Sequence, residues 1–210
     1  MESLIDKPSL VGKAGRYSSA LTTGTLLHTE SVRIAELYLE TEDWRKVRAS
    51  AVMENLLQAR TVSSLKKLCA EVISRLRLLT RSELVLLIKG TRHEQLQLLW
   101  IALAKRYRLV FEFGAEVLSE KVLRLDLQFT PHNYDQFFSE KAEWHEELAS
   151  LSPGTQAKLR QNLIKILHET ELLTMDNRIN LILVSRKLFE GMSRDSKCYV
   201  KAFAFMQVEK

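Results

Sequence analysis

The stretch from Trp44 to Leu79, WRKVRASAVMENLLQARTVSSLKKLCAEVISRLRLL, decides the expected fold of this 210-residue chain. It contains two helical patterns with a very short break: one runs from Trp44 to Gln58, and one follows Thr61, a good N-cap residue. In the second pattern, apolar residues at spacings of three and four form one stripe: Val62, Leu65, Leu68, Cys69, Val72, Ile73 and Leu76. Two helices joined by a tight turn predict a helix-turn-helix unit, whose second helix can lie in the major groove of DNA.

The polar side of this stretch is basic. Residues 43–79 contain eight Lys or Arg against three Asp or Glu, a local net charge of +5. DNA binding is one interpretation, and a plain helical hairpin with solvated charges is the other. If DNA binds, phosphates would be contacted from the first helix, the turn and the hydroxyl-rich start of the second helix, by Arg45, Arg48, Arg60, Thr61, Ser63, Ser64, Lys66 and Lys67.

Other residues of the stretch are expected to hold it together. Asn55 lies near a helix end, where its amide can hydrogen-bond the following turn. Trp44 begins an apolar stripe and is predicted to be a core anchor rather than a stacking platform. Cys69 falls on the stripe and is predicted to be a small buried apolar residue.

Composition also favours an all-α, mainly helical globular fold. The chain has only seven Gly and three Pro, which the turns of β-proteins favour, and 46% of its residues are hydrophobic. Its net charge of +5 is compatible with a polyanionic partner. Two cysteines make no disulfide framework, and residues 1–10 lack the apolar core of a signal peptide, so we expect a cytoplasmic protein without a membrane partner.

We divide the chain at a soft boundary after residue 125. Residues 1–125 are predicted to form a helical bundle that contains the first helix-turn-helix, about 43–79, after a basic arm at residues 1–16. Thr80-Arg-Ser-Glu83 and Thr91-Arg-His-Glu94 are capping boxes, and Gly90 is placed to end the first of these helices. The helix after Thr91 is apolar nearly all round and is predicted to be buried. A further helix is predicted over 110–122.

Residues 126–210 are predicted to hold a second helix-turn-helix, about 133–170. An acidic helix over 133–150, with exposed Phe137 and Phe138, is followed by the turn Leu151-Ser-Pro-Gly154. The next helix is capped by Thr155. Residues 151–168 contain three basic residues and no acidic one. The DNA-binding candidates on this helix are Thr155, Lys158, Arg160, Gln161 and Lys165.

Three segments leave alternatives open. Residues 123–129 alternate with period two, as a short strand or an extended linker does. Residues 172–183 are either a hairpin that turns at Asp176-Asn177, making a minor β-wing beside the second unit, or a loop that runs into a helix through Arg186. Residues 198–206 are either a strand or a last helix.

No catalytic pattern is present in the sequence. The five histidines are scattered, and there is no phosphate-binding Gly-rich loop, no nucleophile elbow and no Cys/His metal spacing. Because a catalytic site needs clustered, mutually positioned groups, we expect a protein that is not an enzyme and that uses no cofactor or metal.

With these motifs in place, the sequence resembles the BrxA family, a small core component of the bacteriophage-exclusion (BREX) defence systems of bacteria. The resemblance is close over 17–122 and looser beyond. Its most specific part is the string Asn-Leu-Leu-Gln-Ala-Arg-Thr-Val-Ser-Ser at 55–64, which no generic helical pattern requires. It is also carried by Trp44-Arg-Lys-Val-Arg48, Arg75-Leu76, Glu94-Gln-Leu-Gln-Leu-Leu-Trp100, Tyr107, Phe113 and Glu116-Val117.

The resemblance implies an all-helical, non-enzymatic protein of the bacterial cytoplasm, with two helix-turn-helix units that bind double-stranded DNA. It also implies work beside a methyltransferase and other BREX proteins. The competing hypothesis is an adaptor that assembles those proteins through the acidic helix, with DNA contact incidental. Because few candidate residues suit base edges, we expect contacts mainly to phosphates and weak sequence preference.

Overall fold

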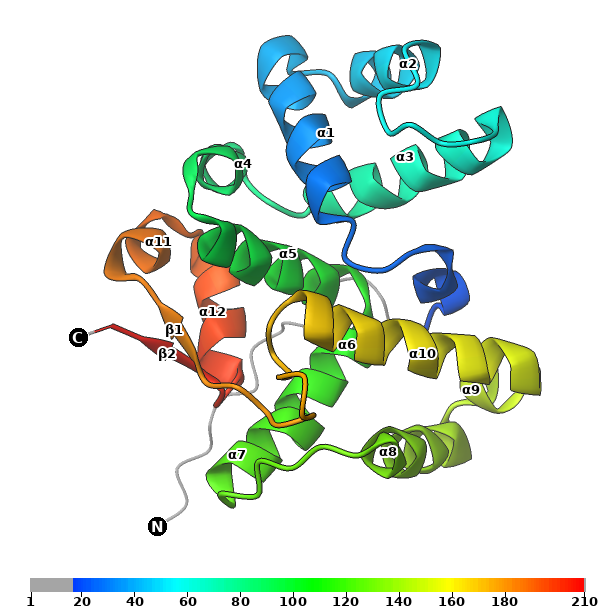
Figure 1. Ribbon diagram of the computed structural model, residues 1–210, viewed down its shortest axis with the longest axis vertical. Helices are drawn as coiled ribbons and strands as arrows, with labels where there is room; N and C mark the ends of the chain where they lie inside the picture. The colour runs from blue at the N-terminus through cyan, green and yellow to red at the C-terminus, as the bar shows by residue number, and fades with distance from the viewer. Residues whose placement is uncertain (1–16, 210) are drawn as a thin grey trace.

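The computed structural model describes residues 17–209 and confirms the mainly helical fold. The proposed basic arm at 1–16 lies outside the described residues. In chain order the helices are η1 (Ser19–Thr23), α1 (His28–Thr41), α2 (Trp44–Met53), α3 (Val62–Leu76), α4 (Arg81–Lys89), α5 (Arg92–Arg106), α6 (Arg108–Glu112), η2 (Phe113–Leu118), α7 (Ser119–Leu123), α8 (Pro131–Trp144), α9 (Glu146–Ala149), α10 (Pro153–Glu169), α11 (Arg186–Gly191) and α12 (Arg194–Ala202). The strands are β1 (Ile182–Val184) and β2 (Met206–Val208) (Figure 1).

Helix α5 lies in the middle of the molecule, as its nearly all-round apolar sequence predicts (Figure 1). Its residues from Leu96 to Ala104 are all buried. The C-terminal segment packs against it, because Phe203 and Phe205 place their rings 5.9 and 6.1 Å from that of Trp100. The core therefore joins parts of the chain that are far apart in sequence.

The predicted helix over 110–122 is confirmed with wider limits, as α6, η2 and α7 in direct succession. Its middle part, η2, is a π-helical segment. Gly114 lies at the closest approach to the core: a Cβ atom there would come within 2.8 Å of the Phe203 ring and 3.1 Å of Trp100. This contact explains why a glycine occupies the position.

Local helix signals are confirmed in detail. Both predicted capping boxes are present, at Thr80 with Glu83 and at Thr91 with Glu94, and Gly90 is the C-cap of α4. Thr61 caps α3 by accepting a hydrogen bond from the backbone N–H of Ser64. Caps depend on side chains within three residues of the helix start, and at these three helices the sequence pattern was enough to place them.

Three helix limits differ from the prediction. Helix α2 ends at Met53 rather than Gln58, so the link to α3 covers residues 54–61 and is not a tight turn. The acidic helix over 133–150 is two helices, α8 and α9, which meet at His145. Thr155 does not cap α10: Ser152 does, by accepting from the Thr155 N–H, because Pro153 already occupies the first helical position.

The segment after α10 contains both features that the sequence left open. Residues 172–180 form an antiparallel hairpin with a Leu173–Ile179 bridge, and a loop then leads through β1 into α11. A third extended segment, 127–129, pairs with the hairpin through a Gln128–Arg178 bridge. The Phe129 N–H donates to the Asn177 carbonyl (2.8 Å), and the Ile179 N–H donates to the Leu127 carbonyl (2.8 Å). The order across this small sheet is 127–129, 177–179, 172–174.

The last segment for which the sequence left two alternatives, 198–206, is mainly the end of α12, and β2 begins only at Met206. Strands β2 and β1 pair in parallel, with Leu183 opposite Gln207. Helix α11 packs on α4 and α12 packs on α5, so residues beyond 125 contact helices before it. The division of the chain at 125 stays a prediction.

Candidate nucleic-acid interface

The first candidate surface surrounds the start of α3, and we call it the α3 surface. All eight of its predicted residues are exposed: Arg45, Arg48, Arg60, Thr61, Ser63, Ser64, Lys66 and Lys67. For the residues on α3, exposure follows from the helical period, since Leu65, Cys69, Val72 and Leu76 take the buried face of that helix. The structure therefore presents these basic and hydroxyl side chains to solvent.

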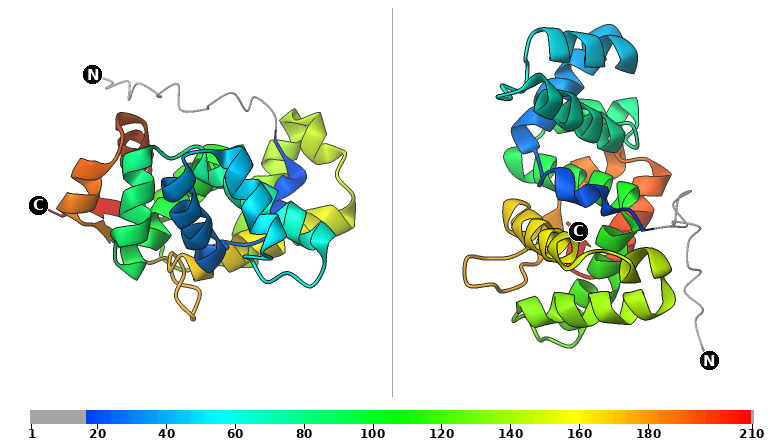
Figure 2. Two further views of the ribbon diagram at one scale, coloured as in Figure 1. Left: turned by 90° about the horizontal axis from the view of Figure 1, so that it is seen from above. Right: turned by 90° about the vertical axis from the view of Figure 1, so that its right-hand side faces the viewer.

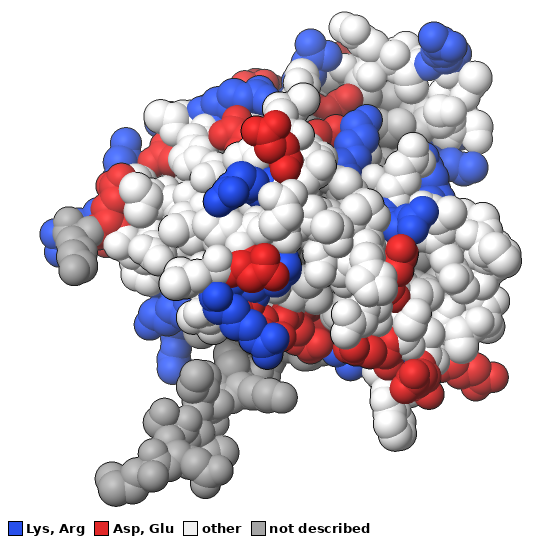
Figure 3. Space-filling model, turned by 60° about the horizontal axis from the view of Figure 1, so that its bottom comes forward, with Lys and Arg blue, Asp and Glu red and all other residues white. Residues whose placement is uncertain are grey.

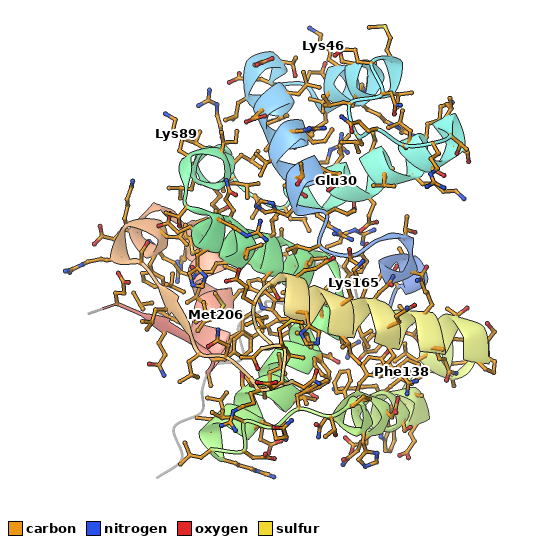
Figure 4. The ribbon with its side chains drawn as sticks, viewed as in Figure 1. Glu30, Lys46, Lys89, Phe138, Lys165 and Met206 are labelled. Atoms are coloured by element: carbon orange, nitrogen blue, oxygen red, sulfur yellow. The ribbon has the colours of Figure 1, made fainter. Side chains whose placement is uncertain are left out.

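The charges of the α3 surface are not neutralised by acidic neighbours. Within residues 17–209, Arg45, Arg48, Arg60, Lys66 and Lys67 take part in none of the ion pairs. Lys46, which was not among the predicted contacts, is also exposed, and it points away from the body of the molecule at the top of Figure 4. Its position between Arg45 and Arg48 in the sequence could have marked it as a further candidate contact.

The link that leads into α3 has a defined conformation. Asn55 accepts a hydrogen bond from the Ala59 N–H (3.0 Å) and donates to the Ala59 carbonyl (3.3 Å), which confirms the predicted role of its amide. Asn55 and Gln58 adopt left-handed backbone angles, with φ of 46° and 51°. Leu57 is buried and the Leu56 carbonyl accepts from Arg33 (3.1 Å), so the link is held to α1.

A buried ion pair in the C-terminal half of α3 ties this helix to the rest of the molecule. The Arg75 guanidinium contacts the Glu71 carboxylate (2.7 Å) and donates to the carbonyls of Thr25 (2.6 Å) and Leu26 (3.2 Å). The Tyr107 hydroxyl donates to the same Glu71 carboxylate. Burial and the Glu71 charge raise the pKa of Tyr107 well above its usual value, so the hydroxyl remains a donor. These contacts fix the C-terminal half of α3 to the segment before α1 and to Tyr107, and thereby fix the direction of the whole helix.

Trp44 is half-buried at the base of this surface. Its ring stacks on Tyr38, with centroids 3.9 Å apart, and packs against the core, as an anchor does. The other face is not free for a base, because the Arg77 guanidinium lies 5.8 Å from the ring centroid. The prediction of a core anchor is confirmed.

The second candidate surface is the outward face of α10, and we call it the α10 surface. Its members are Thr155, Lys158, Arg160, Gln161 and Lys165; Lys158, Gln161 and Lys165 are exposed, and Thr155 and Arg160 are partly exposed. The opposite face, with Leu159, Leu163, Ile166 and Leu167, is buried as predicted. A shallow groove follows the outer face between Pro131, Ile164 and His168.

The α10 surface differs from the α3 surface in that its charges have partners. Arg160 pairs with Asp135 of α8 (2.8 Å), and Lys165 lies 3.6 Å from Glu169. Lys158 donates to the Gln161 side chain (3.0 Å). Exposed pairs of this kind contribute about 0–1 kcal/mol each, so a phosphate can displace the carboxylate. The α10 surface therefore has a weaker positive potential than the α3 surface, but its basic side chains remain accessible to a phosphate.

The link that leads into α3 and the hairpin that follows α10 lie on one side of the molecule. In both panels of Figure 2 the link 54–61 and the 172–180 hairpin reach the same edge, which is the side facing the viewer in Figure 1. Helix α10 lies in front on that side, and Lys165 is labelled on it in Figure 4. Acidic side chains gather elsewhere, in a row along the lower right of Figure 3, where α8 and α9 lie.

Two features bear on other functions. Among residues 17–209 no cluster of His, Cys, Asp and Glu is arranged to hold a metal ion. Within the same range no helix is long and apolar enough to cross a membrane. Cys69 is buried, as predicted.

The fold and its two exposed basic helices define a mainly helical protein with two candidate polyanion surfaces. Comparison with known proteins gives the family. The sequence profile of the BrxA family matches residues 15–196, and the chain belongs to that family.

Two relatives and one solved structure illustrate the relationship. The BREX protein BrxA of Escherichia coli O9:H4 (strain HS) is 32% identical over 173 residues, covering 82% of this chain and 81% of that protein. The BREX protein BrxA of Bacillus cereus (strain H3081.97) is 29% identical over 157 residues, covering 75% and 78%. The crystal structure of an uncharacterized protein from Magnetospirillum magneticum superposes with a TM-score of 0.74 at 21% identity, covering 90% of this chain and 98% of that one, which supports the fold.

Proposed function

We propose that this protein is a non-enzymatic, double-stranded DNA-binding component of a BREX phage-defence system. Membership of the BrxA family, and relatives named as BREX proteins, support the BREX part. The DNA part rests mainly on one observation: exposed basic side chains, which form no ion pair with an acidic residue of the range 17–209, surround the start of α3. Unpaired charge at a helix start, where backbone N–H groups point outward, favours phosphate ligands.

In the first unit, α1 to α3 form three mutually packed helices, with α3 in the position of a recognition helix. Thr61 both caps α3 and donates its hydroxyl hydrogen to the Ser64 hydroxyl (2.9 Å), so Ser64 retains a donor for a phosphate oxygen. Lys66 and Lys67 add charge from the first two turns. Arg45 and Arg48 of α2 and Arg60 of the link would contact the neighbouring backbone.

In the second unit, the connectivity supports a winged helix-turn-helix. A helix (α6 to α7) leads to the extended segment 127–129, then to α8, to α10 and finally to the 172–180 hairpin. The pairing order places the strand after the turn between the other two, as in that motif. Helix α10 then has the position of the recognition helix, with Lys158, Gln161 and Lys165 facing the DNA.

The residue types favour contacts to phosphates over base readout. Lys, Ser and Thr position a protein on the duplex, whereas bidentate Arg and Asn or Gln pairs read bases. We therefore propose binding with steep salt dependence and weak sequence preference.

The test is fluorescence anisotropy with a labelled duplex over a range of salt concentrations. Each lysine that contacts a phosphate contributes about 0.9 to the slope of log affinity against log salt. Lys66→Glu/Lys67→Glu and Lys158→Glu/Lys165→Glu should each flatten that slope by roughly 2. Flattening in one variant alone would make the other unit structural.

The control is Lys89→Glu/Lys201→Glu, which makes the same charge change at exposed lysines of α4 and α12. Lys89 lies well away from Lys165 in Figure 4. Equal slopes for the control and both test variants would mean that only net charge matters, against two defined surfaces. No binding at low salt would refute DNA binding by this protein.

An adaptor for other BREX proteins is the second candidate, and it needs a different surface from the one predicted. The sequence predicted that Phe137 and Phe138 are exposed, and this prediction is wrong. Their side chains are only 3% and 7% accessible, because they pack from α8 into the core. Trp144, at the end of α8, is 84% exposed in an acidic region and favours this candidate. If Trp144→Ala abolishes phage exclusion while Lys66→Glu/Lys67→Glu leaves it intact, the adaptor is the better account.

A further inference from the structure

The hairpin after α10 ends in an exposed tip, residues 174–178, that has no role in the core. Met175 is 91% exposed at the end of the turn, and all five tip residues are exposed. In Figure 2 the hairpin projects beyond the body of the molecule, on the side where α10 presents its outer face. Intramolecular packing gives no reason for an apolar side chain there.

The tip is nevertheless held in a fixed position. The Thr174 N–H donates to the Arg178 carbonyl (2.9 Å), and Asn177 turns the chain with a left-handed φ of 55°. The Gln128 amide donates to the carbonyls of Asp176 (3.3 Å) and Asn177 (3.4 Å) from the neighbouring segment. The tip is thus held by a hydrogen bond within the hairpin and by the Gln128 amide from the segment paired on one side of it.

The same hairpin is tied to the proposed recognition helix. It begins three residues after α10 ends, and the Leu173 N–H donates to the Leu167 carbonyl of that helix (3.0 Å). The Asn180 side chain donates to the Glu171 carbonyl (3.2 Å) and closes the base of the hairpin. A ligand that lies along α10 therefore meets the tip at a set distance.

The chemistry of the tip suits one part of a duplex. Arg178 is exposed and, within the described part of the chain, takes part in none of the ion pairs. Asn177 offers an exposed amide beside it. Arg, Asn and Gln are the side chains that read the minor groove, and Met is among the apolar wedges that enter between base steps there.

We propose that the tip 174–178 enters the DNA minor groove next to the major groove that α10 faces, with Arg178 in the groove and Met175 against the base steps. This assignment rests on the proposed DNA binding and names the groove that this part of the protein recognises. It gives the α10 surface, whose own charges are paired, an additional anchor. It also adds a preference for A·T-rich sequence, because the guanine amino group obstructs the minor groove.

One tip residue opposes binding and provides a test of opposite sign. Asp176 is exposed and acidic, between Met175 and Asn177. A carboxylate this close to the phosphates is repelled, so Asp176→Asn should bind duplex DNA more tightly, by roughly two- to fivefold at low salt. A misfolded variant cannot produce a gain of this kind.

The experiment measures the affinity of the full chain for three duplexes that share a length and differ in the minor groove. One is A·T-rich, one is G·C-rich, and one has inosine for guanine, which removes only the minor-groove amino group. The wild type should prefer the A·T and inosine duplexes over the G·C duplex. Met175→Ala/Arg178→Ala should lose that preference and bind roughly five- to tenfold more weakly.

Leu183→Ala/Arg186→Ala is the matched control, because it removes an exposed apolar residue and an exposed arginine from β1 and α11. Unchanged affinity and preference in Met175→Ala/Arg178→Ala would overturn the wing, and so would weaker binding that keeps the preference. Either outcome would contradict the wing proposal but not the proposed salt-dependent DNA binding through the α3 surface. If the wild type binds no duplex, the proposed function fails, and the wing fails with it.

Discussion

The Glu83 carboxylate in the first turn of α4 accepts hydrogen bonds from the backbone N–H (2.9 Å) and the hydroxyl (2.8 Å) of Ser193, which precedes α12. Its other oxygen accepts from the Thr80 N–H (2.7 Å) and completes the capping box. Glu83 is fully buried. One side chain thus caps its own helix and joins it to a segment 110 positions later in the chain.

Glu83 gives the fold a pH dependence. Burial alone would raise its pKa, but hydrogen bonds from Ser196, Thr80 and Ser193 outweigh burial and lower it. A carboxyl whose pKa is lower in the folded state stabilises above its unfolded value of about 4.3, and the stabilisation is lost as pH falls through the folded value. Glu83→Gln should reduce the free energy of unfolding by about 1–3 kcal/mol at pH 7. Urea unfolding from pH 3 to 7 should show the difference shrinking in acid, and a constant difference would contradict this account.

The Arg75–Glu71 pair should behave as a unit. Arg75→Met alone leaves the buried Glu71 charge without its partner and should cost about 3–5 kcal/mol of unfolding free energy. Glu71→Gln/Arg75→Met should cost less than the sum of the two single variants, because no uncompensated charge remains. Chemical denaturation of all four proteins measures the coupling. Additive losses would show that the two side chains act independently.

Gly114 should be intolerant of a methyl group. Gly114→Ala places a Cβ 2.8 Å from the Phe203 ring and should destabilise by about 1–3 kcal/mol. Gly154 is the matched control, because nothing lies within 4 Å of its added Cβ, and Gly154→Ala in α10 should stabilise by about 0.4–1 kcal/mol. Thermal unfolding should move the two melting temperatures in opposite directions. Equal shifts would mean that contact with Phe203 is not the cause.

Releasing Arg160 should strengthen DNA binding if α10 contacts DNA. Asp135→Asn removes the partner of Arg160 and one negative charge, and should tighten duplex binding by roughly two- to fivefold at low salt. Glu190→Gln releases Arg186 in the same way, from an exposed pair on α11. Anisotropy should show a gain for Asp135→Asn only. A gain of the same size in both variants would point to net charge instead of the α10 surface.

The candidate surfaces could be predicted in part. The exposure of Lys66 and Lys67, and of Lys158 and Lys165, follows from helical period opposite an apolar stripe, and the structure places them so. Period does not show whether a charge has a partner. The pairing of Arg160 with Asp135, and the absence of such pairing for Lys66 within the described residues, depend on how separate helices pack.

Two errors have the same origin. Phe137 and Phe138, in a helix rich in acidic residues, were both predicted to be exposed, but the tertiary packing of α8 buries both. Helix α2 was predicted to continue to Gln58 but ends at Met53. After it, Asn55 and Gln58 adopt left-handed backbone angles, and the buried Leu57 between them packs into the core. In each case a long-range contact overrides a local preference.

By itself the sequence determined the helical class, the caps at Thr61, Thr80 and Thr91, and the buried helix after Thr91, because helix signals act over three or four residues. Only the tertiary structure decided that residues 127–129 join the hairpin after α10, and that this hairpin and the link before α3 lie on one side. Those relations depend on contacts between residues tens of positions apart, which period and capping do not encode.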